Sequence, residues 1–444
     1  MVTLVIRKLA ARLAGAAGVI LNIVGTMAVL TLTTGPAAAA PRAGPAAAVP
    51  AASAAFRRAT EIRLPANAAA VQDSQLTAVA CTSAGPCVAG GSYRDRGGHY
   101  EPMVVAGSGG TWARAVELRL PRNAAAQPGA GVTGVACPRA GSCVAVGFYL
   151  YQGGSGNQLG FTATESGGTW ARAQAGLLPA NSAASRDGDL EAVTCTGAGS
   201  CQAIGSYTNR AGTSQAMAVT EVQGRWRRAS EISAPPNARP NPASFLHGLA
   251  CTRAGSCVAS GFYTDSSATN QAMRVTESNG VWSRATSIAL PRNASMNPEA
   301  FIDSLTCTAT GRCLGVGGYD TAAALQAMSV TQAGGRWRRA TQIAAETGAL
   351  NTGLYAVTCI TAAQCVAVGN FANPADHFLA LSVTRSHGRW GPAAVVTTLR
   401  NANLGGIQFG VLDAIACTTT GHCTAVGSYT SRSGSRLPMA ATRP

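Results

Sequence analysis

Charged side chains are scarce in this chain of 444 residues, since Asp, Glu, Lys and Arg together make up 12% of it. Lysine occurs once, at Lys8, so the net charge of +15 comes almost wholly from arginine. Nucleic-acid-binding proteins usually gather Lys and Arg on one face, whereas these arginines recur at regular intervals. We therefore expect no nucleic-acid partner.

Aromatic residues are also few, at 5%, while glycine occurs 52 times. This composition favours many short strands and tight turns over helices with bulky cores. The sequence has no phosphate-binding loop and no Gly-x-Ser-x-Gly elbow. The histidines have no metal-ligand spacing; they are His99, His247, His377, His387 and His422. We expect no cofactor and no metal, and no motif names a substrate.

No cysteine stands outside one recurring motif, in which two cysteines lie six residues apart. The pairs are Cys81 and Cys87, Cys137 and Cys143, Cys195 and Cys201, Cys251 and Cys257, Cys307 and Cys313, Cys359 and Cys365, and Cys417 and Cys423. Zinc is one interpretation, but zinc sites favour Cys-x2-Cys spacing with a second pair nearby. The other is a disulfide across a hairpin, which brings the Cα atoms close enough and stabilises the fold by about 2 kcal/mol for so short a loop. We expect seven disulfides.

The first 40 residues are typical of a secretory signal peptide. Arg7, Lys8 and Arg12 precede an apolar run over 16–32, and small residues at 36–40 suit cleavage. An uncleaved membrane anchor is the alternative, because the run approaches the roughly 20 residues that span a bilayer. Residues 41–55, rich in Ala and Pro, are expected to be a linker. Local cysteine pairs also fit an oxidising compartment. We expect an extracellular protein without stable membrane insertion once the signal is removed.

A repeat begins at residue 56, and the first cysteines of successive pairs lie 56, 58, 56, 56, 52 and 58 residues apart. Each interval holds four short apolar segments separated by turn residues, which predicts four strands per repeat. Around Cys251 these strands are 245–251, 257–263, 271–277 and a fourth that begins at Trp282. In the other repeats the fourth strand begins at Trp112, Trp170, Trp226, Trp337 and Trp390.

The two ends of the repeat region complement each other. Residues 56–62 match a fourth strand with no strands before it, and Phe56 stands at the tryptophan position. After Cys417 and Cys423 the chain reaches a third strand at 437–441 and no fourth. An N-terminal strand that completes the last repeat closes a ring. The sequence therefore predicts an all-β, seven-bladed β-propeller over residues 56–444.

The motif Cys-x5-Cys-x-Ala-Val-Gly-x-Tyr resembles that of exported bacterial β-propeller repeat proteins, and this resemblance covers residues 56–443. The Thr-Glu-x-x-Gly-x-Trp turn at 276–282 looks like the Asp-box hairpin of sialidase-like propellers. It lacks the aspartate of that hairpin and differs by one residue in length. The resemblance implies a propeller fold in which the first strand of each blade lies innermost.

Three positions recur with little variation, and we interpret them as structural. A glycine follows each second cysteine by four residues and suits a bulge or a close backbone approach. An aromatic residue two positions later, usually Tyr, is expected to pack with its hydroxyl at the rim. Arginine lies two residues after the fourth-strand aromatic in six blades. It forms either a ring of anion sites or a charged edge that prevents strand pairing.

One position varies among the blades while keeping its place, four residues before each first cysteine. It holds Thr77, Thr133, Glu191, His247, Asp303, Tyr355 and Asp413. On an innermost strand these side chains would ring one mouth of the central channel. We take Glu191, His247, Asp303, Tyr355 and Asp413 as candidate binding residues for a cation, a sugar or a basic peptide group. A strand junction that tolerates any polar residue is the alternative.

These features favour an exported, non-catalytic binding scaffold with an unidentified protein or carbohydrate ligand. An extracellular glycosidase or lyase working at the channel mouth through Glu191, Asp303 or Asp413 is the alternative, since paired carboxylates suit glycoside hydrolysis. A purely structural surface protein is a third interpretation.

Overall fold

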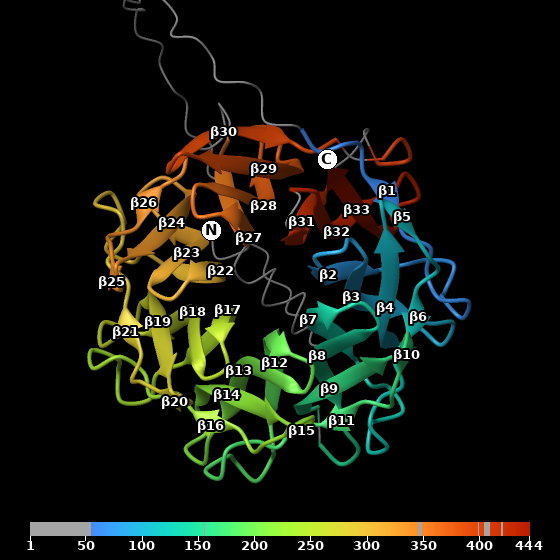
Figure 1. The fold of residues 1–444 in the computed structure, drawn as a ribbon, viewed down its shortest axis with the longest axis horizontal. Helices are drawn as coiled ribbons and strands as arrows, with labels where there is room; N and C mark the ends of the chain where they lie inside the picture. The colour runs from blue at the N-terminus through green and yellow to red at the C-terminus, as the bar shows by residue number, and fades with distance from the viewer. Residues whose placement is uncertain (1–54, 155, 345–348, 398, 404–408, 419–420) are drawn as a thin grey trace, which may run out of the picture.

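Seven antiparallel sheets surround a central axis in the computed structural model (Figure 1). The structure describes residues 55–154, 156–344, 349–397, 399–403, 409–418 and 421–444. The prediction of a seven-bladed, all-β propeller is confirmed. The expected signal peptide, 1–40, and nearly all of the linker, 41–55, lie outside the described residues and stay predictions. No helix among the described residues has the length and apolar character to cross a membrane.

The two inner strands of each blade meet at the cysteine pair. The innermost strands of blades 1–7 are β2 (Gln75–Cys81), β7 (Gly131–Arg139), β12 (Gly188–Gly197), β17 (Ser244–Arg253), β22 (Phe301–Ala309), β27 (Asn351–Thr361) and β31 (Gly410–Cys417). The second strands are β3 (Cys87–Arg94), β8 (Ser142–Leu150), β13 (Ser200–Thr208), β18 (Ser256–Thr264), β23 (Arg312–Asp320), β28 (Gln364–Ala372) and β32 (Cys423–Thr430).

The third strands form the outer half of the blades with the fourth segments. They are β4 (Tyr100–Ser108), β9 (Gln158–Ser166), β14 (Ser214–Val222), β19 (Asn270–Ser278), β24 (Leu325–Ala333), β29 (Phe378–Ser386) and β33 (Arg436–Arg443). The fourth segments are β5 (Thr111–Trp112) with β6 (Val116–Glu117), β10 (Thr169–Trp170) with β11 (Gln174–Ala175), β15 (Arg225–Trp226) with β16 (Ser230–Glu231), β20 (Val281–Trp282) with β21 (Thr286–Ser287), β25 (Arg336–Trp337) with β26 (Thr341–Gln342), β30 (Arg389–Val395) and β1 (Thr60–Glu61).

In blades 1–5 the fourth strand begins at the expected tryptophan but is split into two pieces. In blade 4, β20 and β21 both pair with β19. Between them the backbone turns to the neighbouring blade, and the N–H of Ala285 donates to the carbonyl oxygen of Ser233 at 2.9 Å. The same bond recurs at Ala115, Ala173, Ala229 and Ala340. The outer segments therefore join adjacent blades as well as completing their own.

The recurring arginines form contacts that neither expectation included. In four blades the guanidinium donates from Nη1 to a backbone carbonyl just after the outer segment of the preceding blade, at 2.6–3.0 Å. The pairs are Arg114 to Leu64, Arg172 to Leu120, Arg228 to Leu178 and Arg339 to Leu290. These four arginines tie neighbouring blades together.

The N-terminal strand closes the ring, as the complementary ends predict. β1 pairs with β33, with Thr60 opposite Ala440 and Glu61 opposite Met439, and the two lie side by side in Figure 1. The strand is shorter than the expected 56–62. Before it, the N–H of Arg57 donates to the carbonyl oxygen of Thr442 at 2.7 Å, so the first described residues and the last share one blade.

All seven expected disulfides form, which excludes zinc ligation by these cysteines. The bonds join Cys81 to Cys87, Cys137 to Cys143, Cys195 to Cys201, Cys251 to Cys257, Cys307 to Cys313, Cys359 to Cys365, and Cys417 to Cys423. Their Cα atoms lie 3.9–4.2 Å apart, across the end of each inner hairpin. Disulfides persist in oxidising compartments, so this set fits an extracellular or periplasmic setting.

The second cysteine of each disulfide is buried, so these residues belong to the framework of the blades. The buried cysteines are Cys87, Cys143, Cys201, Cys257, Cys313, Cys365 and Cys423. In blade 2 the strand register shifts between Ala136 and Arg139, so Cys137 and Cys143 are bonded without being a registered pair. In the other six blades the two cysteines lie directly opposite each other. No described cysteine is left with a free thiol for chemistry.

The recurring tyrosines are buried, and their hydroxyls bond to asparagines, most of which are exposed. Tyr93 and Tyr263 are fully buried. The hydroxyl of Tyr263 donates to Oδ1 of Asn237 at 2.8 Å, in the segment that enters the blade from its neighbour. Five other blades have the same Tyr–Asn bond, namely Tyr93–Asn67, Tyr149–Asn123, Tyr207–Asn181, Tyr319–Asn293 and Tyr429–Asn401. A buried hydroxyl needs such a partner.

The recurring glycine is explained by a close backbone approach, as the sequence indicated. A Cβ atom added to Gly205 would lie 2.1 Å from the carbonyl oxygen of Asp189 on the adjacent strand. At the other six positions the distance to the equivalent oxygen is 1.9–2.0 Å; they are Gly91, Gly147, Gly261, Gly317, Gly369 and Gly427. Any larger residue would force the two inner strands apart.

We predict that Gly205→Ala lowers the free energy of unfolding by about 2 kcal/mol, because the added methyl group overpacks the β12–β13 pair. Gly197→Ala, in the same hairpin, is the control, since an added Cβ there has no atom within 4 Å. It should change stability by about 0.5 kcal/mol or less. Urea unfolding of both variants measures the difference, and equal losses would contradict the explanation.

Candidate functional site

The seven variable positions share one local geometry, a β-bulge in the innermost strand. In blade 4, Leu246 pairs with Gly261 and Gly248 with Ser260, so His247 is the extra residue. The same shift leaves Thr77, Thr133, Glu191, Asp303, Tyr355 and Asp413 as extra residues in their strands. A bulge re-aims the side chain of its extra residue.

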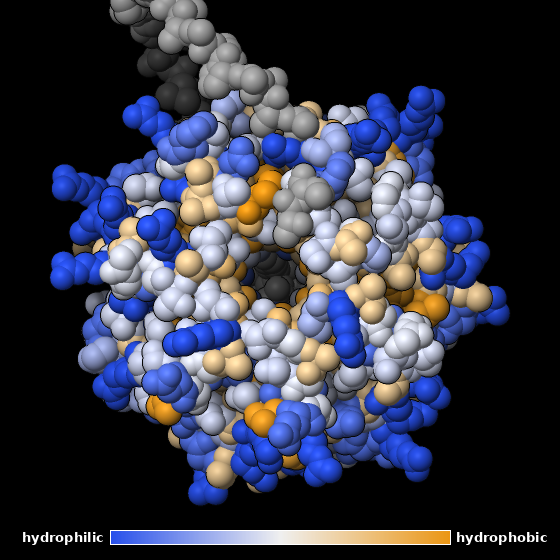
Figure 2. All heavy atoms as spheres, viewed as in Figure 1, coloured by the Kyte–Doolittle hydropathy of each residue, from blue (hydrophilic) through white to orange (hydrophobic). Residues whose placement is uncertain are grey.

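All seven side chains line one cavity of about 540 Å³ in the centre of the ring. Figure 2 shows a hollow in the middle of one face, while strongly hydrophilic residues lie around the outer rim. The structure therefore brings the five candidate residues to one place. Binding by them is not tested by this geometry and stays a prediction.

The side chains of the two threonines in the ring hydrogen-bond to backbone carbonyl groups of the next blade. The hydroxyl of Thr77 donates to the carbonyl oxygen of Val132 in blade 2, and that of Thr133 donates to the carbonyl oxygen of Leu190 in blade 3. Their short side chains cap the neighbouring bulge, so blades 1 and 2 add little chemistry to the cavity.

His247 and Asp303, two of the candidate residues, are in polar contact. Nδ1 of His247 lies 2.9 Å from Oδ1 of Asp303, and their side chains are 11% and 4% exposed. The contact spans blades 4 and 5. An acceptor at Nδ1 orients an imidazole and selects its tautomer, so Asp303 holds the His247 ring in one orientation.

Tyr355 lies between two acidic members of the ring. Its hydroxyl donates to Oδ1 of Asn370 at 2.9 Å. Burial raises the pKa of Tyr355, and the negative charges of Asp303 and Asp413 raise it further. The phenol therefore stays protonated at neutral pH, as a hydrogen-bond donor.

The remaining lining adds apolar rings and one cation. Phe378 and Phe409 line the cavity with their ring centroids 6.0 Å apart. The guanidinium of Arg436 lies 5.3 Å from the ring centroid of Phe409 and donates from Nε to the hydroxyl of Ser428 at 2.9 Å. With Glu191 from blade 3, the cavity holds three carboxylates and one arginine. It is therefore rich in hydrogen-bond acceptors.

A separate group of possible metal ligands was not predicted from the sequence. Asp95, His99 and Glu101 hold ligand atoms within 4.8 Å of one another in blade 1. Burial raises the pKa of Glu101 to about 7, and the charges of Glu117 and Asp95 add to the shift. Asp95 also accepts from the backbone N–H of His99 at 2.8 Å. That turn brings Asp95 and His99 together.

Comparisons with known proteins show the fold of this chain but do not assign it to a family. No family model matches the sequence, and no curated protein matches it. A solved ulvan lyase shares 9% identity over 87% of this chain and 98% of its own, with a TM-score of 0.51. A protein of unknown function from Dyadobacter fermentans shares 10% over 87% and 98%, with a TM-score of 0.47. Trypanosoma rangeli sialidase shares 9% over 87% and 57%, with a TM-score of 0.42.

The likeness to the ulvan lyase shows the propeller fold alone. The narrower resemblance, to exported bacterial propellers with the Cys-x5-Cys motif, stays a prediction.

A second position also varies among the blades. It was not predicted from the sequence, although comparing equivalent positions of the blades identifies it. Five residues before the fourth-segment tryptophan, or at the equivalent place in blade 7, blades 1–7 hold Gly107, Glu165, Glu221, Glu277, Gln332, Arg385 and Arg443. Three of these residues lie directly opposite the second cysteine of their blade, namely Gly107, Arg385 and Arg443. The second variable position therefore lies at the disulfide end of the blades, away from the bulges.

Glu277 shows what burial does at this second position. It is 2% exposed, and its Oε2 atom has no hydrogen-bond partner among the described residues. Burial raises its pKa, so ionisation costs more in the folded chain than in the unfolded one. The stability that protonated Glu277 contributes is present below the unfolded-state pKa and is lost as the pH rises through the folded-state pKa.

We therefore predict that Glu277→Gln stabilises the protein at pH 7 and leaves its stability unchanged at pH ~3, where glutamate is protonated in both states. Chemical unfolding at both pH values measures this. Asp376→Asn, a similar change at an exposed loop residue, is the control and should have little effect at either pH. A gain from Glu277→Gln of equal size at both pH values would rule out ionisation as the cause.

Proposed function

We propose that this protein is exported and acts as a non-catalytic binding scaffold that takes a saccharide at the acidic mouth of its channel. One observation carries the proposal. Five consecutive blades, 3–7, each direct a bulged side chain that is polar or ionisable into the same cavity. A cavity of about 540 Å³ lies within the usual range for small-ligand sites.

The ligand class follows from the balance of donors and acceptors. Carboxylates only accept hydrogen bonds when ionised, and Glu191, Asp303 and Asp413 suit a ligand with many hydroxyl donors. Phe378 and Phe409 offer apolar surface to the C–H face of a sugar ring. A few placed polar groups among apolar and aromatic walls are typical of such sites.

The absence of catalysis is part of the proposal. Tyr355 is held protonated, as a donor and not a base. Export is proposed from the N-terminal sequence and from the seven disulfides, which suit an oxidising compartment. Rigid blades would then present the site outside the cell.

Enzymatic turnover is the second candidate, and the His247–Asp303 contact favours it. A carboxylate that orients an imidazole is a common arrangement for a general base. In a glycosidase or lyase, His247→Ala would abolish turnover while leaving the blade framework folded. In the binding scaffold no turnover is measured in the parent protein.

We predict that Glu191→Gln and Asp413→Asn each weaken saccharide binding by about tenfold, the effect of losing one hydrogen bond to a charged group. A glycan array finds the saccharide, and isothermal titration calorimetry measures the affinities. Asp376→Asn again serves as control and should bind like the parent. Unchanged affinity in both channel variants would refute the channel as the site, and product release from a bound glycan would favour the enzyme.

A further inference from the structure

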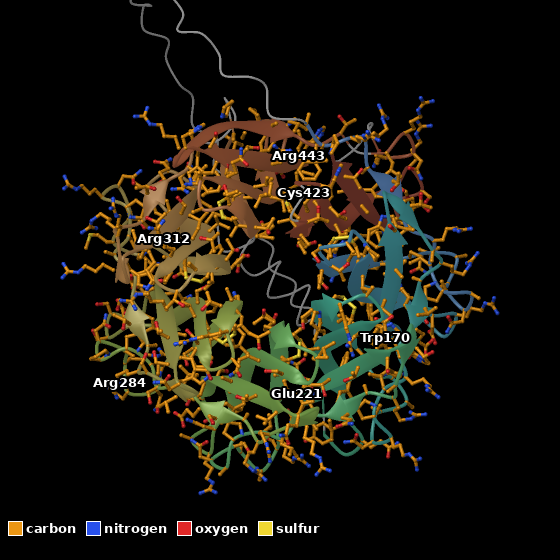
Figure 3. The ribbon with its side chains drawn as sticks, viewed as in Figure 1. Trp170, Glu221, Arg284, Arg312, Cys423 and Arg443 are labelled. Carbon is orange, nitrogen blue, oxygen red and sulfur yellow. A yellow bond between two sulfur atoms is a disulfide. The ribbon has the colours of Figure 1, made fainter. Side chains whose placement is uncertain are left out.

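A cleft between blades 5 and 6 differs in charge from the channel. It has a volume of about 400 Å³, and the described residues that line it include no Asp or Glu. Three arginines line it, Arg312 and Arg338 from blade 5 and Arg385 from blade 6. Figure 3 labels Arg312 in the sector of β22–β26, in a different part of the ring from Glu221.

The three arginines differ in depth. Arg312 and Arg338 are exposed, while Arg385 is half-buried opposite Cys365 of the disulfide. Within the described parts of the chain, none of the three forms an ion pair. The only side-chain hydrogen bond that Arg385 donates there goes from Nη1 to the carbonyl oxygen of Ala362, at 3.4 Å. This leaves most of its five N–H donors for another acceptor.

Hydroxyl groups complete the lining. Thr306, Thr308 and Thr331 belong to blade 5 and line the same cleft. Guanidinium forks and hydroxyls together are the donors that bind sulfate and phosphate oxygens, and Arg suits these anions through paired hydrogen bonds.

An equivalent cleft, between blades 3 and 4, has the opposite character. Glu221 and Glu277 line it, with no arginine among its described lining residues. Arg385 and Glu277 occupy the same position in their blades, opposite the fourth-segment tryptophan. The repeat allows either sign of charge at this position. The repeat alone therefore does not produce the basic cleft.

We propose that the cleft between blades 5 and 6 binds a tetrahedral oxyanion, a sulfate or phosphate group, held by Arg312, Arg338 and Arg385. This site is independent of the saccharide site proposed in the channel. The exposed arginines attract the anion, and Arg385 and the threonine hydroxyls fix it inside the cleft.

The test measures binding of the full chain to dextran sulfate, to polyphosphate and to unmodified dextran at low ionic strength. We expect binding to a charged polymer and none to unmodified dextran, with inorganic sulfate or phosphate as competitor. Arg312→Glu with Arg338→Glu should weaken binding at least about tenfold, because two charge-assisted contacts become repulsive. Tighter binding of dextran sulfate identifies a sulfate group, and tighter binding of polyphosphate a phosphate group.

The control separates this cleft from the general positive charge of the protein. Arg227 lies one residue after Trp226, as Arg338 lies one residue after Trp337, and it is exposed. Arg225→Glu with Arg227→Glu makes the same charge change beside the acidic cleft and should reduce binding less than about threefold. Equal losses in both double variants, or no binding to either charged polymer, would overturn the proposal. Arg385→Gln removes the buried charge alone and should also weaken binding, with folding checked by its unfolding midpoint.

Discussion

The structure depends on one close contact that is repeated in every blade, between the Cα atom of a glycine and the carbonyl oxygen of the neighbouring inner strand. At Gly261 a Cβ atom would lie 1.9 Å from the oxygen of Phe245. The contact lets the innermost strand carry an extra residue beside it, here His247. Because the bulge belongs to the backbone, its side chain is free to vary. The fold thereby fixes where seven side chains lie without fixing what they are.

The contacts between blades also recur with the repeat, and the buried polar groups in them have hydrogen-bond partners. Six blades pair a buried Tyr with an Asn, as in Tyr263 and Asn237. Blade 6 has Phe371 instead, and the residue 26 positions earlier, which is Asn in the first five blades, is Ala345. A buried tyrosine hydroxyl left without its partner would cost roughly 1–3 kcal/mol. Both partners are therefore absent together, and Phe371 packs in an apolar cluster.

The sequence repeat made the architecture predictable, whereas the contacts between blades could not be predicted from it. Cysteine spacing and complementary ends predicted the hairpins, the disulfides and the closing strand β1. The split fourth strand and the role of Arg114 depend on carbonyl groups in the preceding blade, which no local pattern reveals. For the site, variation at one position selected His247 and Asp303, and consecutive blades made them neighbours. Their 2.9 Å contact and the hydrogen bond of Thr77 to a backbone carbonyl depend on tertiary packing, which the sequence does not show.

An acidic channel and a basic cleft can coexist because the blade separates them. Asp303 lies four residues before Cys307, and extended chain rises about 3.3 Å per residue, so roughly 13 Å of strand separates the bulge from the disulfide end. The Coulomb energy of two unit charges falls with the distance between them, so charges at the two ends interact about three times more weakly than a pair in contact at about 4 Å. Each blade can change one end without penalty at the other, so a ring of similar blades can hold sites of opposite charge.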